Sequence, residues 1–155
     1  MASRKHRIRT YEKFGRMVNA PAAVSRVKGD RLPVPDSCRY CAGEIELVSN
    51  AEFYGGKEFG WPLAYRCKCC GARVGTHPGT DIPLGTLADR ATMKARQEAH
   101  AAFDPLWKNR TEWHRHRAYQ ALAQAMNMRF AHISWMDEAE CRRVVELCRN
   151  GALQV

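Results

Sequence analysis

Short runs in which polar and apolar residues alternate predict a small antiparallel β unit between residues 36 and 85. Residues 44–48 alternate strictly, as a strand with one buried face does. The other predicted strands are short and cover residues 52–54, 63–66 and 72–75. The pair Gly55-Gly56 predicts a turn after the second strand.

Three longer stretches have apolar residues three and four positions apart, which predicts helices. They cover residues 86–107, residues 110–127 and a last segment that begins near Asp137. Thr86 precedes Asp89 by three positions, which matches an N-cap pattern. Asp104-Pro105 should end the first helix, because the residue before a proline resists α geometry. The second half of the chain is therefore predicted to be helical.

The apolar faces of the last two helices are expected to be buried. The predicted stripe of the second helix contains Trp113, Ala118, Leu122, Ala125 and Met126. The predicted buried face of the last helix contains Cys141, Val144, Val145 and Cys148, and Asn150-Gly151 follows as a C-cap. Cys141 and Cys148 are seven positions apart on this face, so we interpret them as buried apolar thiols.

Residues 1–35 are expected to form a basic N-terminal arm, in which residues 11–18 fold as a short helical turn. Pro21, Gly29, Pro33 and Pro35 then interrupt regular structure. The predicted organisation is this arm, a β unit with its following helix at residues 36–107, and a helical hairpin at residues 108–155. The predicted fold class is α+β.

Positive charge is concentrated at the start of the chain. Residues 1–31 contain nine Lys and Arg against two acidic residues, residues 32–85 contain five against six, and residues 86–155 contain eleven against eight. A basic arm attracts nucleic acid, although a solvated tail has the same composition. The expected phosphate contacts are Arg4, Lys5, Arg7, Arg9, Lys13 and Arg16, with Arg39, Lys68 and Arg73 from the β unit.

Two Cys-x-x-Cys pairs, Cys38/Cys41 and Cys67/Cys70, stand in the predicted β unit with 25 residues between them. Two intervening residues let both thiolates of a pair meet one ion, and a nearby glycine permits a turn with positive φ. Four cysteines close a tetrahedral shell, so the pattern predicts one structural Zn²⁺ in a zinc-ribbon or treble-clef-like unit. An iron–sulfur centre is the alternative that cysteine ligation alone leaves open.

The fourth ligand has a competitor, because Cys69 is adjacent to Cys70. We favour Cys70, since its spacing repeats that of the first pair and glycine follows it. Arg39 and Lys68 lie inside the two pairs, where they would offset the negative charge of a zinc–thiolate centre or contact phosphate.

The segment after the second pair is rich in Gly, Thr and Pro and leads into the predicted helix at Thr86. Its candidate ligand or partner residues are His77, Thr80, Asp81 and Thr86. One interpretation is a phosphate-binding or nuclease-like loop at a helix N-terminus. The other, which we favour, is a rigid loop that connects the β unit to the helix. No residue is assigned a catalytic role.

Residues 113–117 (Trp-His-Arg-His-Arg) combine an aromatic side chain with basic ones. They would suit nucleic-acid contact, although a core tryptophan with a solvated basic face is the simpler interpretation. No stretch approaches the length of a membrane span, and no apolar segment follows the basic N-terminus. We therefore expect a cytosolic protein without membrane contact.

Several segments together resemble a known family. They are Cys38-x-x-Cys41, Ala51-Glu52-Phe53-Tyr54-Gly55, Tyr65-Arg66-Cys67-x-x-Cys70, residues 74–88 around His77 and Asp81, residues 99–107, and His132-Ile133-x-Trp135-Met136-Asp137. The sequence over residues 36–150 is similar to phage and prophage zinc-finger-containing domain proteins, a family catalogued as a domain of unknown function. The resemblance implies the four-cysteine zinc site and a phage origin, and it implies no reaction.

The leading hypothesis is a phage protein that binds nucleic acid, or a host complex bound to nucleic acid, in the bacterial cytosol. A second hypothesis is an inhibitor or adaptor that binds host transcription, repair or defence proteins. A third is a zinc-stabilised nuclease that uses His77.

Overall fold

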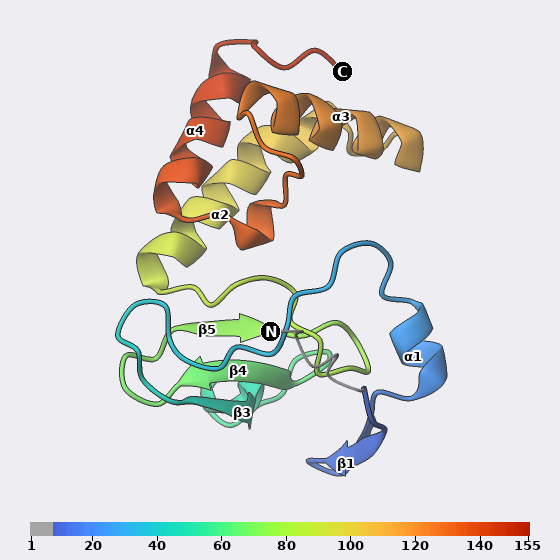
Figure 1. Cartoon of the computed structure of the whole chain (residues 1–155), viewed down its shortest axis with the longest axis vertical. Helices are drawn as coiled ribbons and strands as arrows, with labels where there is room; N and C mark the ends of the chain where they lie inside the picture. The colour runs from blue at the N-terminus through green and yellow to red at the C-terminus, as the bar shows by residue number, and fades with distance from the viewer. Residues whose placement is uncertain (1–7) are drawn as a thin grey trace, which may run out of the picture. The chain divides into compact units, whose positions relative to one another are not determined.

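A three-stranded antiparallel sheet forms the centre of the first half of the chain. Its strands are β3 (Ile45–Ser49), β4 (Leu63–Cys67) and β5 (Arg73–Gly75), in the order β3-β4-β5 (Figure 1). Ile45 pairs with Cys67 and Ser49 with Leu63. The middle strand is the most buried of the three, as its apolar sequence requires. These strands confirm three of the four predicted from alternation.

The computed structural model describes residues 8–155, which form two compact units divided between Asp89 and Arg90. The first unit contains both sheets, and the second contains three long helices. The division differs from the predicted boundary at residue 107, because helix α2 (Arg90–Phe103) contributes its buried face to the helical core. The α+β fold class is confirmed.

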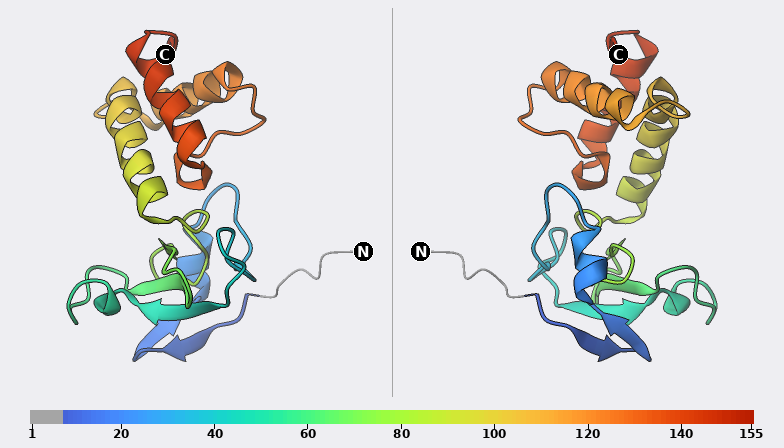
Figure 2. Two further views of the ribbon diagram at one scale, coloured as in Figure 1. Left: turned by 90° about the vertical axis from the view of Figure 1, so that its left-hand side faces the viewer. Right: turned by 90° about the vertical axis from the view of Figure 1, so that its right-hand side faces the viewer.

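Residues 11–18 form a β-hairpin, and the predicted helical turn there is wrong. Strand β1 (Tyr11–Lys13) pairs with β2 (Arg16–Val18) in antiparallel register. The two loop residues, Phe14 and Gly15, have φ angles of 50° and 68°, as the two central residues of a type I′ turn do. A five-residue helix, α1 (Pro21–Ser25), follows (Figure 2).

The predicted strand at residues 52–54 is also wrong. A 3₁₀ turn, η1 (Asn50–Glu52), stands there, and the Ser49 hydroxyl accepts a hydrogen bond from the Ala51 N–H at its start. This local bond competes with strand pairing. Gly55 and Gly56 both have positive φ, at 65° and 87°, which confirms the turn predicted after this segment.

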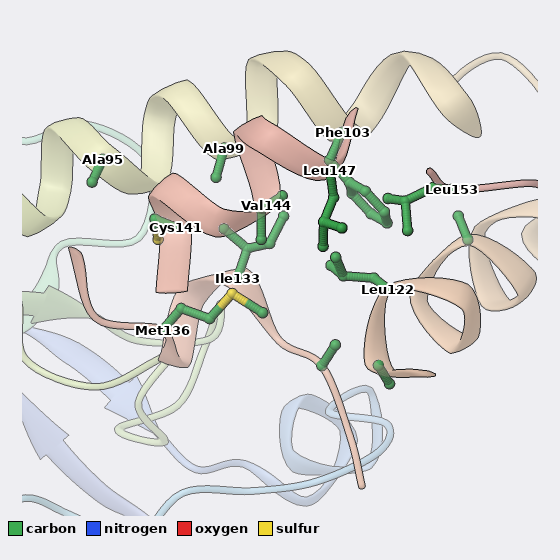
Figure 3. Packing of buried hydrophobic residues seen from close by; sticks show 13 residues of the cluster. Ala95, Ala99, Phe103, Leu122, Ile133, Met136, Cys141, Val144, Leu147 and Leu153 are labelled. Atoms are coloured by element: carbon green, nitrogen blue, oxygen red, sulfur yellow. The ribbon is translucent and has the colours of Figure 1, made fainter. Parts of the chain in front are cut away.

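The second unit packs α2 together with α3 (Glu112–Ala125) and α4 (Glu138–Arg149). Short 3₁₀ turns lie at η2 (Asp104–Leu106) and η3 (Ile133–Trp135). Phe103, Leu122, Ile133, Met136 and Val144 are among its most deeply buried side chains (Figure 3). Cys141 is fully buried in the same core, as predicted, whereas Val145 and Cys148 are only half-buried and pack against its edge.

The ends of the helices agree with the sequence except at Thr86. Asp137 caps α4, because its side chain accepts the N–H of Glu140 while the Glu140 side chain accepts the N–H of Asp137. By contrast, α2 begins only at Arg90. Ala88 instead exchanges two backbone hydrogen bonds with Arg73, both 3.0 Å long, which holds Ala88 in a β-bridge where the predicted helix would already have begun. Thr86 is therefore not a helix N-cap.

Trp113 is not part of the buried stripe of α3. Its side chain is 59% exposed, and Ala125 of the predicted stripe is exposed as well, whereas Ala118, Leu122 and Ala123 supply the buried face. The prediction was wrong because it placed Trp113 on the buried face for its apolar side chain alone, although within the described residues no other element covers that side chain.

Candidate metal centre

The two cysteine pairs lie in neighbouring turns that the sheet brings together. Cys38 and Cys41 precede β3, while Cys67 ends β4 and Cys70 lies in the turn toward β5. Since Ile45 pairs with Cys67, the start of β3 and the end of β4 lie side by side. Both turns therefore present their sulfur atoms to the same point.

The two turns have the same backbone structure, residue for residue. Each turn is closed by two backbone hydrogen bonds. In one, the N–H of the first cysteine donates to the carbonyl of the residue five positions later; in the other, the N–H of the residue four positions later donates to the carbonyl of that cysteine. The bonds are Cys38 N–H to Gly43 O (2.9 Å), Cys67 N–H to Ala72 O (2.8 Å), Ala42 N–H to Cys38 O (2.8 Å) and Gly71 N–H to Cys67 O (3.1 Å). Such duplication is typical of paired zinc knuckles.

The glycines of the two turns have different functions. Gly71 has a φ of 77°, which agrees with the predicted need for a positive angle. In the first turn the equivalent residue is Ala42, with a φ of 60°, so the prediction that Gly43 supplies this angle is wrong. Gly43 is required for space, because a Cβ atom there would lie 2.9 Å from the Cys67 sulfur and 3.1 Å from the Cys41 sulfur.

The four sulfur atoms have the spacing that one zinc ion needs. The Sγ atoms of Cys38, Cys41, Cys67 and Cys70 all lie within 4.8 Å of one another. Cys38 Sγ is 3.5 Å from Cys70 Sγ, and Cys41 Sγ is 3.5 Å from Cys67 Sγ. Tetrahedral ligation with Zn–S bonds of about 2.3 Å requires sulfur separations of roughly 3.8 Å. The residues present therefore fit the ion.

Backbone N–H groups already favour the thiolate form that a metal requires. The N–H of Cys70, followed by that of Cys69, lowers the pKa of Cys67 to about 6, against the opposing effect of burial. In the first turn, the N–H of Tyr40 donates to Cys38 Sγ over 3.4 Å. Cys67 is thus the thiolate of the metal-free cluster. Against backbone N–H groups that lower it, the neighbouring thiols raise the pKa of Cys41, and burial together with the neighbouring thiols raises that of Cys70.

Cys70, not Cys69, completes the cluster. Cys69 occupies the third position of its turn, as Tyr40 does in the first, and its side chain is exposed. The alternative pairing of Cys67 with Cys69 is therefore wrong, and the preference for Cys70 is confirmed. Among residues 8–155, this cluster is the only group of three or more Cys, His, Asp or Glu placed to hold a metal ion.

Residues 34–151 match a family model described as a zinc-finger-containing domain. The chain belongs to this family. The family is one of unknown function, so membership identifies the metal and not the activity. Comparison with curated proteins and with solved structures finds no match. In this zinc-finger-containing domain, the four-cysteine cluster is a single structural zinc site, because its closed shell leaves no position for a substrate.

The basic side chains around the zinc site of the domain are partly engaged. Arg39 donates to the Thr86 hydroxyl over 3.0 Å, and Lys68 pairs with Glu44 at 2.9 Å. The Arg73 guanidinium lies 4.2 Å from the centre of the Phe53 ring.

Of the residues expected in the basic arm, Arg9, Lys13 and Arg16 lie in or beside the hairpin, and Arg16 pairs with Glu58 at 2.7 Å. Arg4, Lys5 and Arg7 lie outside the described residues.

Asp81, a candidate ligand residue, fastens the N-terminal hairpin to the zinc-binding unit. One carboxylate oxygen accepts from the Asn19 amide at 2.9 Å, and the other accepts from the Tyr11 hydroxyl at 2.8 Å. The Asn19 amide oxygen in turn accepts the Asp81 N–H at 3.0 Å, and the Tyr65 hydroxyl donates to the Asp81 carbonyl at 2.5 Å. Burial, together with the Asp81 carboxylate, raises the pKa of Tyr11, so this hydroxyl stays a donor.

The rest of the loop is held equally firmly. Thr80 is fully buried and donates to the His77 carbonyl, while its hydroxyl oxygen accepts the Ile82 N–H. The Trp61 indole N–H lies 2.8 Å from the Thr80 carbonyl and 2.9 Å from the Thr76 hydroxyl. These bonds make the loop a structural element of the unit.

His77 is a poor phosphate ligand, because its imidazole has no positive charge to attract a phosphate. Burial, followed by the nearby Arg31 guanidinium, lowers the pKa of His77, so the imidazole is neutral at pH 7. Two residues later, a Cβ at Gly79 would lie 2.8 Å from the Ala23 Cβ of α1, so the helix packs directly on this loop. Helix α1 therefore covers the loop at Gly79.

Sequence reasoning missed the hairpin's anchor. Asn19 is 4% exposed and has a φ of 61°, a conformation that asparagine tolerates better than most residues. Its amide also donates to the Arg9 carbonyl. An asparagine two positions before a proline was the available signal, but nothing in the sequence links it to Asp81, 62 residues away.

No helix within the described part of the chain is long and apolar enough to cross a membrane.

Proposed function

We propose that this zinc-finger-containing domain protein binds nucleic acid, with its basic N-terminal segment held on the zinc unit as a contact surface. The observation that supports the proposal most is the double hydrogen bonding of Asp81 to Tyr11 and Asn19. It fixes the hairpin that contains Lys13 and Arg16 to a rigid scaffold. A preorganised set of cations binds phosphates at a lower entropic cost than a loose tail does.

The hairpin supplies cations beside exposed apolar groups. The Lys13 ammonium lies 5.1 Å from the centre of the Phe14 ring, and Phe14 and Met17 are both exposed. Arg26, Lys28 and Arg31 follow in the same segment, so residues 8–31 contain six basic and two acidic residues. We include Arg4, Lys5 and Arg7, and Arg39, Lys68 and Arg73, in the proposed contact surface as a lesser contribution.

The test is binding of a labelled duplex across a salt series. Each phosphate contact contributes about 0.9 to the slope of log K against log salt on duplex DNA, so Arg9→Ala/Lys13→Ala should reduce the slope by roughly 2. The matched control is Lys94→Ala/Arg143→Ala, which removes two cations that pair with Glu98 and Glu146. Equal effects of both double variants would show that net charge alone matters, and no binding at low salt would refute the proposal.

A protein partner is the second candidate, favoured by exposed aromatic side chains on the loop between β3 and β4. Tyr54 and Phe59 are 51% and 55% exposed, and their rings meet edge to face at 5.2 Å. This cluster would suit an adaptor or inhibitor that docks on a host transcription, repair or defence protein. Pull-down from a bacterial lysate with and without nuclease separates the two candidates, since a directly bound protein survives digestion.

We do not extend the proposal to nuclease activity. Asp81 already uses both carboxylate oxygens to hold the hairpin, and the His77 imidazole lies beside the Arg31 cation. Plasmid nicking with Mg²⁺ that disappeared in His77→Ala would contradict this view. We place the proposed binding in the cytosol of a bacterium that carries the phage or prophage, in keeping with the resemblance and with the free thiols of the chain.

A further inference from the structure

Helix α3 has a tryptophan on its solvent-exposed side. Trp113 is 59% exposed, and its indole is the one exposed tryptophan side chain among residues 8–155. His116, Arg117 and Gln120 are exposed as well, and they follow Trp113 at helical spacings of three, four and seven. The exposed ring face of Trp113 is therefore available to a partner, and the groups around it indicate which kind.

The indole is held in place by its neighbours. The Arg117 guanidinium lies 4.8 Å from the centre of the Trp113 ring, and the His114 ring meets the indole edge-on at 5.3 Å. His114 is itself fixed, because its Nδ1 atom lies 2.9 Å from the Thr111 hydroxyl. A ring that is braced in this way loses little conformational entropy when something stacks on it.

The segment that contains this platform is strongly basic. Between Trp107 and Met136 the chain has a single acidic residue, Glu112, and its cations are Lys108, Arg110, Arg115, Arg117 and Arg129. In the part of the chain that the structure describes, none of these five belongs to an ion pair. The neighbouring helices differ, since Arg142 and Arg143 of α4 pair with acidic residues of their own helix.

A second cation–aromatic group lies on the same helix. The Arg115 guanidinium lies 5.3 Å from the Trp107 ring and 5.2 Å from the Tyr119 ring. These two rings are half-buried against the helical core, so the Arg115 group lies on a different side of α3 from Trp113 and Arg117. The exposed ring of Trp113 distinguishes its face from a merely solvated basic surface.

We infer that the exposed face of α3 stacks the unpaired bases of a single-stranded nucleic acid, with Trp113 and Arg117 as the platform. In a duplex the base faces are hidden in the stack, so an exposed indole gains contact only with a single strand or an unpaired end. The surrounding cations bind the phosphates of the same strand. The inference rests on the proposed function. It adds a second binding site, in the helical unit, and specifies that this site takes single-stranded nucleic acid.

The experiment measures fluorescence anisotropy of the full, zinc-loaded chain with labelled oligo(dT), oligo(U) and a duplex at low salt. Trp113→Ala should weaken single-strand affinity by roughly 5- to 150-fold, the range observed for one base–aromatic contact, and leave duplex affinity within about twofold. Trp113→Phe should restore most of the loss, because phenylalanine retains a ring face. The matched control is Phe59→Ala, which truncates a similarly exposed aromatic side chain that lies outside the proposed nucleic-acid contact surface. The two oligonucleotides distinguish DNA from RNA.

Tryptophan fluorescence supplies a readout that a purely structural role would not change. Oligo(dT) should quench the wild-type emission by stacking on Trp113, and Trp113→Phe should bind the strand with most of that quenching lost. Binding that is unchanged in Trp113→Ala overturns the inference and leaves the proposed function intact. If Trp113→Ala lost affinity for single strand and duplex equally, base stacking would be refuted. If the wild-type protein bound no nucleic acid at all, both this inference and the proposed function would be refuted, and a protein partner would be left for this face.

Discussion

Gly43 provides the sharpest test of the zinc-site geometry. A Cβ atom at this position would lie 2.9 Å from the Cys67 sulfur, 3.1 Å from the Cys41 sulfur and 3.1 Å from the Cys69 Cβ. Ordinary contacts of this kind are about 3.5–4.0 Å long, so Gly43→Ala requires a shift of roughly 0.5–1 Å. In the zinc-loaded protein the two sulfurs could not move independently, because both would ligate the same ion.

Overpacking of this size costs about 1–3 kcal/mol. Since each 1.4 kcal/mol is a factor of ten, Gly43→Ala should weaken zinc affinity by roughly 5- to 150-fold while one ion per chain still binds at saturation. Competition with a chromophoric zinc chelator at neutral pH measures the change.

Gly75→Ala is the matched control, because its Cβ would meet only the Leu84 side chain, at 3.4 Å. That variant should bind zinc within about twofold of wild type. A Gly43→Ala chain that did the same would refute the steric argument.

The remaining predictions concern the same unit. Ala42→Gly should raise the free energy of unfolding of the zinc-loaded protein by about 0.5–1 kcal/mol, because the φ of 60° strains alanine; a decrease in denaturant titration would contradict this. Cys70→Ser should reduce zinc content below one ion per chain, whereas Cys69→Ser should retain one, as elemental analysis can measure; the reverse result would make Cys69 the ligand. Asp81→Asn should destabilise the unit by about 1–3 kcal/mol in thermal unfolding, since it weakens two partly buried hydrogen bonds, with zinc stoichiometry unchanged.

Local patterns predicted those features of the fold that depend on neighbouring residues. The cysteine spacing predicted the metal cluster, and alternation in residues 44–48 predicted β3 within one residue. The cap of α4 at Asp137 was equally visible, because both partners of the capping box lie within four residues. These interactions need no knowledge of distant contacts.

The errors occurred where a distant contact decided the conformation. Thr86 satisfies a cap pattern, but the bonds between Ala88 and Arg73 delay the helix until Arg90. The hairpin was mistaken for a helical turn because Tyr11, Phe14 and Val18 have helical spacing and Phe14 is an unusual residue for a type I′ turn.

Among the candidate site residues, all four zinc ligands could be predicted, because the residue type and spacing of the cysteines indicate a metal site without any other information. The function of Asp81 could not, because its partners Tyr11 and Asn19 are 70 and 62 positions away.

The separate core of the helical unit has a consequence for how the protein is handled. Helices α2, α3 and α4, of 14, 14 and 12 residues, supply most of the helical signal, and none of the zinc ligands lies in them. A preparation that had lost its metal would retain most of its circular dichroism at 222 nm and would pass for native. Quality control of this protein therefore requires a metal assay, because a helicity measurement reports on the wrong half of the chain.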